Sequence, residues 1–203
     1  MPVTINGDGS ITGLAAGGIS SAGAIASGAI TSSALPAGSV IQVKSTVKKD
    51  AQTISGAGGG SAGTDVNITG LSFSITPSSS SSLILLQGHI SHYVDGNQQM
   101  GFTLKANGSL ITDAIGDAGN SSQKRIFVSG NSNQSFLGDW QVSTTTFSYR
   151  HAPATTSAVT YQVCYNMATT NGTSYINRSE RDGAYTNYDY RAMSTFTGME
   201  IAA

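Results

Sequence analysis

Charged residues are scarce in this chain of 203 residues, in which ten Lys and Arg stand against eleven Asp and Glu. They make up 10% of the sequence, whereas about 25% is usual in a soluble domain. The only basic pairs are Lys48-Lys49 and Lys124-Arg125, so the release of counterions from phosphates could drive very little binding. We therefore expect no nucleic-acid partner.

The chain also lacks cysteine pairs and long apolar runs. Its single cysteine, Cys164, excludes an intrachain disulfide, and its place in a strand pattern predicts a small buried or half-buried thiol. No stretch is apolar over the length that a bilayer requires, and the N-terminus has neither the basic region nor the continuous apolar run of a secretory signal. We expect no membrane insertion, and assembly in a reducing cytoplasm.

Aromatic residues are absent before Phe73, and the first 39 residues have very little side-chain volume. They hold eight Gly, eight Ala and seven Ser, with one charge at Asp8. Such a segment cannot bury enough apolar area to fold alone. Its larger apolar residues recur at gaps of five to eight residues, which match neither the helical nor the strand period: Ile5, Ile11, Ile19, Ile25, Ile30 and Leu35. We interpret residues 1–39 as an N-terminal stem that buries these side chains against identical chains, with a disordered Gly/Ser linker as the alternative.

Residues 40–203 are predicted to form one all-β domain. Apolar and polar residues alternate along four segments, 40–47, 83–94, 100–104 and 159–167. In the first of these, Ile41, Val43 and Val47 share one face. Gly and Asn turns such as Asn107-Gly108 separate the segments and are typical of antiparallel connections. The pattern predicts an antiparallel β-sandwich or jelly-roll-like domain.

Several short segments occur in a fixed order along nearly the whole chain. Besides the Gly-Ala-Ile steps of the stem, they are Val3-Thr4-Ile5-Asn6-Gly7-Asp8-Gly9, Ile75-Thr76-Pro77-Ser78-Ser79, Pro153-Ala154-Thr155-Thr156-Ser157 and Phe196-Thr197-Gly198-Met199-Glu200-Ile201. Together they resemble the tail-fibre proteins of marine bacteriophages, cyanophages among them. The resemblance implies a homotrimeric fibre of the virion tail, whose N-terminal part docks on other tail proteins and whose C-terminal β-domain faces the host. It identifies no binding residues.

Matches to catalytic motifs lack the context that their chemistry needs. Residues 58–63 satisfy both G-x-G-x-x-G and, from 59, G-x-S-x-G, but they neither follow a parallel strand nor open a helix. Hydrolysis of a glycan needs two carboxylates flanking the scissile bond. The candidates all lie in predicted turns: Asp113, Asp117, Asp139, Glu180 and Asp182. We expect no catalytic residues and no cofactor.

His89 and His92 are the one candidate pair of metal ligands. Because residues three apart on a strand face opposite sides, His92 is predicted to join the Ile90 and Val94 face while His89 points away. We expect no metal site within one chain, with a ring of three identical histidines around a threefold axis as the alternative.

The strongest candidate for a binding surface is the segment from Tyr175 to Arg191. It holds half of the eight tyrosines and six charged residues. A tyrosine ring offers an apolar face to a sugar and a hydroxyl for hydrogen bonding, and Arg and Asp add directed polar contacts. The predicted ligand-binding residues are Tyr175, Arg178, Arg181, Asp182, Tyr185, Tyr188 and Tyr190. The alternative is a loop whose tyrosines pack against the domain or the next subunit.

The sequence thus leads to the expectation of a non-enzymatic, homotrimeric tail-fibre protein that attaches the virion to a host-surface polysaccharide. One alternative is a capsid-decorating or collar fibre of the virion. The other is a glycan depolymerase, which would release oligosaccharide from host lipopolysaccharide.

Overall fold

The structure, a computed structural model, describes residues 4–5, 11–12, 34–55, 65–94, 100–117, 119, 123–130, 139–167, 173–184, 187 and 189–203. The chain divides into two compact units, Met1–Pro36 and Ala37–Ala203. In the first, the two-residue strands β1 (Thr4–Ile5) and β2 (Ile11–Thr12) pair antiparallel with Ile5 opposite Ile11. Of the other predicted stem residues, Leu35 is half-buried, and Ile19, Ile25 and Ile30 lie outside the described residues.

The second unit is all-β, as predicted, and its sheets are antiparallel. Its strands are β3 (Val40–Lys48), β4 (Gln52–Ser55), β5 (Val66–Ile75), β6 (Leu83–Val94), β7 (Met100–Ala106), β8 (Ser109–Leu110), β9 (Val128–Ser129), β10 (Ser143–His151), β11 (Val159–Met167), β12 (Thr173–Ile176) and β13 (Ser194–Ile201). A short 3-10 turn, η3 (Thr112–Ala114), follows β8. No helix among the described residues is long and apolar enough to cross a bilayer.

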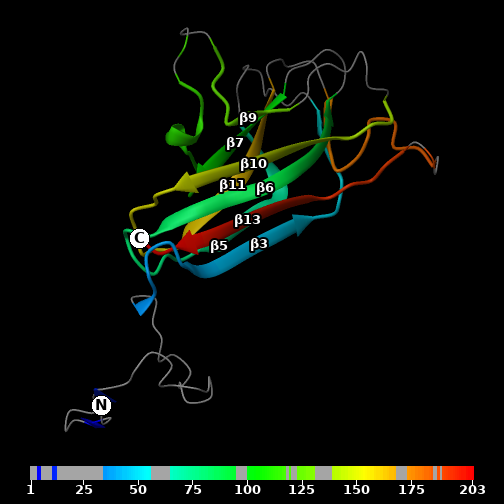
Figure 1. Cartoon of the computed structure of the whole chain (residues 1–203). Helices are drawn as coiled ribbons and strands as arrows, with labels where there is room; N and C mark the ends of the chain where they lie inside the picture. Colours follow the sequence, from blue (N-terminus) through cyan, green and yellow to red (C-terminus); the bar gives the residue numbers. More distant parts are fainter. Residues whose placement is uncertain are drawn as a thin grey trace. The chain divides into compact units, whose positions relative to one another are not determined.

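The strands form two sheets that share one core, an arrangement consistent with the predicted sandwich. In the six-stranded sheet, β13 and β12 pair one after the other with one edge of β6, β3 pairs with β13, β4 pairs with β12, and β10 pairs with the other edge of β6. The five-stranded sheet has the order β5-β11-β7-β8, with β9 also on β7. Figure 1 shows β13 in red between β3 and β6, with β10 beyond β6. Thr46 of β3 donates to the carbonyl of Gly70 on β5 at 2.8 Å, which joins the two sheets along one side.

Alternating side chains of the longest strand, β6, build the core as the sequence predicts. Ile84, Leu86, Ile90 and Val94 are all fully buried. Along β11, where the sequence alternates in the same way, the apolar residues are buried too, at Val159, Tyr161, Val163 and Tyr165. The side chain of Met167 lies outside the described residues. Phe73 of β5 packs on Phe196 of β13 with ring centroids 4.7 Å apart, and a Cβ on Gly198 would collide with the Phe73 ring. A glycine at position 198 therefore lets the two sheets approach closely.

The edge strand β3 shows the opposite of the usual amphipathic pattern. Val43 and Val47 share a face, as predicted, but it is the outer face, where they are 53% and 50% exposed. Ile41 lies in the β-bulge opposite Glu200 and Ile201. The inner face carries Lys48, whose side chain is buried and whose Nζ lies 2.5 Å from the Asp50 carboxylate. The long stem of a lysine can cover apolar surface while its ammonium reaches a partner at the rim, so the period was predicted but not the direction of burial.

A buried carboxylate closes the end of the six-stranded sheet. Oε1 of Glu200 accepts hydrogen bonds from the backbone N–H and hydroxyl of Ser78, both at 2.6 Å, and from the Ser82 hydroxyl at 2.7 Å. Oε2 accepts one from Gln42 at 2.6 Å. Burial favours the neutral acid, but these donors together outweigh it and hold the pKa of Glu200 below its usual range. The 77–82 loop is thereby tied to β13.

The lone cysteine and the two histidines are placed as predicted. Cys164 is fully buried, its thiol donates to Oδ1 of Asn67 at 3.2 Å, and burial raises its pKa to about 12. His92 lies in the core, where burial lowers its pKa to about 4. His89 lies on the other face of β6, where its ring nitrogens contact Thr195 and the Met193 carbonyl. Among the described residues no three His, Cys, Asp or Glu side chains come close enough to hold a metal ion.

Candidate functional site

The segment predicted to bind ligand leaves the six-stranded sheet through a break in its strand order. Strands β12 and β13 pair with the same edge of β6, because Ile176 lies opposite His92 and Thr195 lies opposite His89. Residues 178–193 therefore form an excursion from the sheet between two strands that lie end to end. At its base, the backbones of Arg178 and Arg191 form an isolated antiparallel β-bridge. The Ala192 N–H also donates a hydrogen bond to the Asn177 carbonyl at 3.0 Å.

Asn177 holds the base of the excursion in place. It is fully buried and has a φ of 62°, in the left-handed region that Asn tolerates better than most residues. Its side-chain amide donates to the carbonyls of Lys48 and Asp50 at 2.8 and 3.1 Å, and its Oδ1 accepts from the Ser194 hydroxyl at 2.6 Å. Its backbone N–H donates to the Ser91 carbonyl at 2.8 Å. One side chain thus connects β12, β13 and the β3–β4 junction.

Ion pairs within the excursion engage its charged side chains. The Asp182 carboxylate accepts a bidentate contact from Arg191, with both N···O distances at 2.7 Å, and its Oδ2 also lies 3.3 Å from the Arg178 guanidinium. Arg181 contacts Oδ1 of Asp189 through two nitrogens, each at 2.9 Å. Two-pronged pairs of Arg and carboxylate fix both position and orientation. These residues hold the loop in its shape.

Tyr175 and Arg178 pack on the sheet. The Tyr175 ring lies beside that of Tyr93 with centroids 6.1 Å apart, and the Arg178 guanidinium lies 4.2 Å from the Tyr175 ring centroid. Arg178 also donates to the Thr53 hydroxyl at 2.9 Å. Stacking of this kind stabilises the fold of the excursion on β12 and β4.

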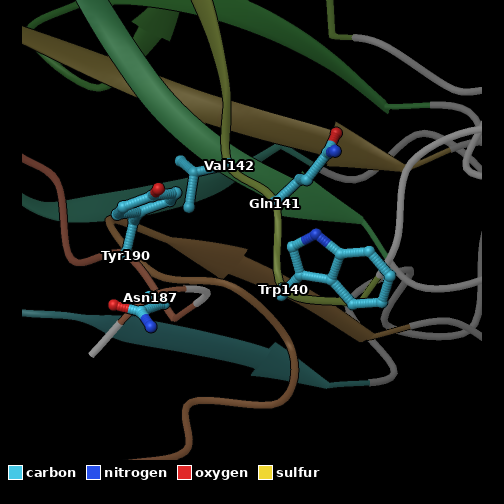
Figure 2. Close-up of a pocket in the computed structure, with 5 residues that line it drawn as sticks. All are labelled: Trp140, Gln141, Val142, Asn187 and Tyr190. Atoms are coloured by element: carbon cyan, nitrogen blue, oxygen red, sulfur yellow. The ribbon is translucent and has the colours of Figure 1, made fainter. Parts of the chain in front are cut away.

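An open cleft lies where the excursion meets the segment that leads into β10. It has a volume of about 450 Å³ and is lined by Trp140, Gln141, Val142, Asn187 and Tyr190, which Figure 2 shows as sticks. The two ring systems are accessible, with Trp140 38% and Tyr190 60% exposed. Arg181 joins the two segments, because its N–H donates to the Asp139 carbonyl at 3.2 Å and its guanidinium lies 5.6 Å from the Trp140 ring centroid.

The chemistry of this cleft suits a ligand with both apolar faces and hydroxyl groups. Two aromatic rings supply flat apolar surface, and the side-chain amides of Gln141 and Asn187 can each donate and accept hydrogen bonds. Ligand sites generally combine apolar walls with a few polar groups in this way.

The predicted binding residues therefore separate into groups. Tyr190 lines the cleft, Tyr175 and Arg178 pack on the sheet, and Arg181 and Asp182 form ion pairs. Tyr185 and Tyr188 lie outside the described residues. Sequence reasoning missed Trp140, Gln141 and Asn187. The available signal was that Trp140 is the only tryptophan of the chain and lies in a polar stretch outside any strand pattern.

Two of the carboxylates considered for hydrolysis, Asp182 and Asp117, are engaged in contacts within the protein. Asp182 is paired with two arginines, and Oδ1 of Asp117 accepts from the Gly119 N–H at 3.2 Å. Asp113 lies close enough to Tyr149 to add to the effect of burial, which raises the pKa of that phenol. The glycine-rich motifs at 58–63 lie outside the described residues.

Comparison with known proteins adds no family to this picture, since no protein-family model and no curated protein matches the sequence.

Proposed function

We propose that this protein is a non-enzymatic component of a phage tail fibre that attaches the virion to a saccharide on the host surface. The observation that carries the proposal is the open cleft between Trp140 and Tyr190, which presents two accessible aromatic side chains beside two amides. Aromatic rings stack on the C–H faces of sugars, and amides bond to their hydroxyls. The order of segments that resembles marine tail-fibre proteins supports the virion setting.

The proposed roles of the two parts of the chain are those that the sequence analysis suggests. Residues 1–39 form a stem that joins three chains and docks on other tail proteins, and residues 40–203 form a β-sandwich that faces the host. The proposed location is the virion tail, with assembly in the host cytoplasm.

The ion pairs of the excursion favour binding over hydrolysis. Two of its carboxylates, Asp182 and Asp189, are held by arginine side chains rather than set apart as an acid and a nucleophile across a cleft. No cofactor enters the proposal.

Trp140→Ala is expected to weaken binding to host cells by about tenfold or more, because loss of a stacking ring at a binding site costs on the order of 1 kcal/mol or more. The measurement is adsorption of fluorescently labelled protein to host cells as a function of concentration. Met193→Ala is the matched control, since Met193 is the last residue of the excursion and is 47% exposed but does not line the cleft. Equal adsorption by the Trp140 variant and the wild type, with melting curves unchanged, would show that the cleft is not the attachment site.

The full-length chain is expected to have the mass of a trimer at micromolar concentration, because a single stem would leave its apolar side chains from Ile5 to Leu35 exposed to water. Light scattering combined with size exclusion measures the mass directly. A monodisperse monomer would contradict the trimeric fibre while leaving the saccharide-binding domain in place.

A further inference from the structure

We propose that the cleft selects neutral saccharides, in which hexopyranose units carry hydroxyls and no carboxylate or sulfate. This inference rests on the proposed function and specifies the chemical class of its ligand. It follows from how the charges around the cleft are used.

The three arginines of the excursion are already ion-paired. Arg181 lies over Trp140 but contacts Asp189 at 2.9 Å, and Arg191, the neighbour of Tyr190, makes its two-pronged contact with Asp182 at 2.7 Å. Arg178 shares the same carboxylate at 3.3 Å. An acidic sugar would have to break one of these pairs to gain a cation, and the broken pair would leave a carboxylate without its partner.

No lysine or arginine lines the cleft itself. All ten Lys and Arg of the chain lie among the described residues, and only the three arginines above belong to the excursion. The excursion balances them with Glu180, Asp182 and Asp189, so its formal charge is zero. In addition, the residues that line the cleft carry no charge of their own. An anionic ligand therefore finds each arginine of the excursion already engaged by a carboxylate.

The polar groups that line the cleft match neutral hydroxyls. Gln141 and Asn187 carry amides, which both donate and accept hydrogen bonds, as a sugar hydroxyl does. Recognition through amides and ring stacking involves no net charge, so salt does not screen it.

The test compares hexoses with the uronic acids of the same configuration. Oligomers of glucose, galactose and mannose are printed beside oligomers of glucuronate, galacturonate and mannuronate of the same length and linkage, and the full-length protein is applied at low and at high salt. We expect binding to at least one hexose oligomer, with its uronate counterpart weaker by about tenfold. The hexose signal should be lost in Trp140→Ala and should not change with salt.

A charge variant tests the cause directly. Asp182→Asn keeps the shape of the side chain but leaves Arg178 and Arg191 without their carboxylate, and the Arg191 side chain is 58% exposed. We expect this variant to gain binding to uronate oligomers by about threefold or more at low salt, with its melting temperature confirming the fold. Asp117→Asn, remote from the excursion in sequence, is the matched control.

The outcomes separate the two proposals. Uronate binding by the wild type that equals hexose binding and is lost in Trp140→Ala overturns the neutral class and leaves saccharide attachment standing. An unchanged preference in a folded Asp182→Asn protein overturns charge pairing as its cause. The absence of binding to every oligomer, with normal adsorption to host cells by the Trp140 variant, overturns both proposals.

Discussion

Asn177→Ala is expected to lower the free energy of unfolding by about 3 kcal/mol or more. The substitution removes three side-chain hydrogen bonds and leaves the carbonyls of Lys48 and Asp50 and the Ser194 hydroxyl without this partner in a buried setting. It also places an alanine at a φ of 62°, which costs about 1 kcal/mol. The measurement is urea denaturation followed by circular dichroism.

Two further variants identify the source of this loss. Asn177→Gly relieves the backbone strain without restoring the hydrogen bonds, so it should recover only about 1 kcal/mol. Asn107→Ala is the control, because Asn107 also has a positive φ, of 49°, but is exposed and makes one side-chain bond, to the Thr160 N–H at 2.9 Å. A loss for Asn177→Ala no greater than for Asn107→Ala would show that the base of the excursion is not held by this side chain.

Glu200→Gln is expected to destabilise the protein by about 2 kcal/mol or more at neutral pH. An amide offers one acceptor oxygen where the carboxylate offers two, so at least one of the donors from Ser78, Ser82 and Gln42 is left unpaired in a buried site. The 77–82 loop should loosen along with β13. Thermal unfolding of the variant and of an Asp117→Asn control measures the difference.

The same carboxylate makes stability depend on acid. Because the pKa of Glu200 is lowered in the folded protein, its contribution is fully present above the unfolded value of about 4.3 and is lost as the pH falls through the folded value. The gap in melting temperature between the wild type and Glu200→Gln should therefore narrow as the pH falls below about 4. A gap that is constant with pH would mean that the ionised form is not what the Ser78 and Ser82 donors stabilise.

The fold was predictable where strands are long and one face is buried. Alternation along 83–94 and 159–167 has the strand period, and burial of one face specifies which residues point inward. The burial of β3 was not predictable in this way, because this edge strand buries the aliphatic part of Lys48 and exposes Val43. The two-residue period of a strand can be seen in the sequence, whereas which of its two faces is buried depends on the segments that pack against it.

The candidate site was predictable only in part, for a different reason. The concentration of Tyr, Arg and Asp at 175–191 did indicate a distinctive surface segment, but those residue types serve equally for ligand contacts and for pairing with one another. Three of the predicted residues, Arg178, Arg181 and Asp182, make such pairs within the chain. Trp140 is about 50 residues from Tyr190 in sequence, and no local pattern reveals that the fold brings both to one cleft.

The closed base of the excursion has a consequence for how the protein can diversify. Since Asn177 and Ala192 are hydrogen-bonded to each other and Arg178 bridges to Arg191, the chain enters and leaves the excursion at neighbouring points. Because β12 and β13 pair with β6 on either side of these points, we expect the residues between them to tolerate exchange or a change of length without loss of that pairing. Under the proposed function, changes confined to this one segment would alter the ligand that the cleft accepts without altering the strands that support it.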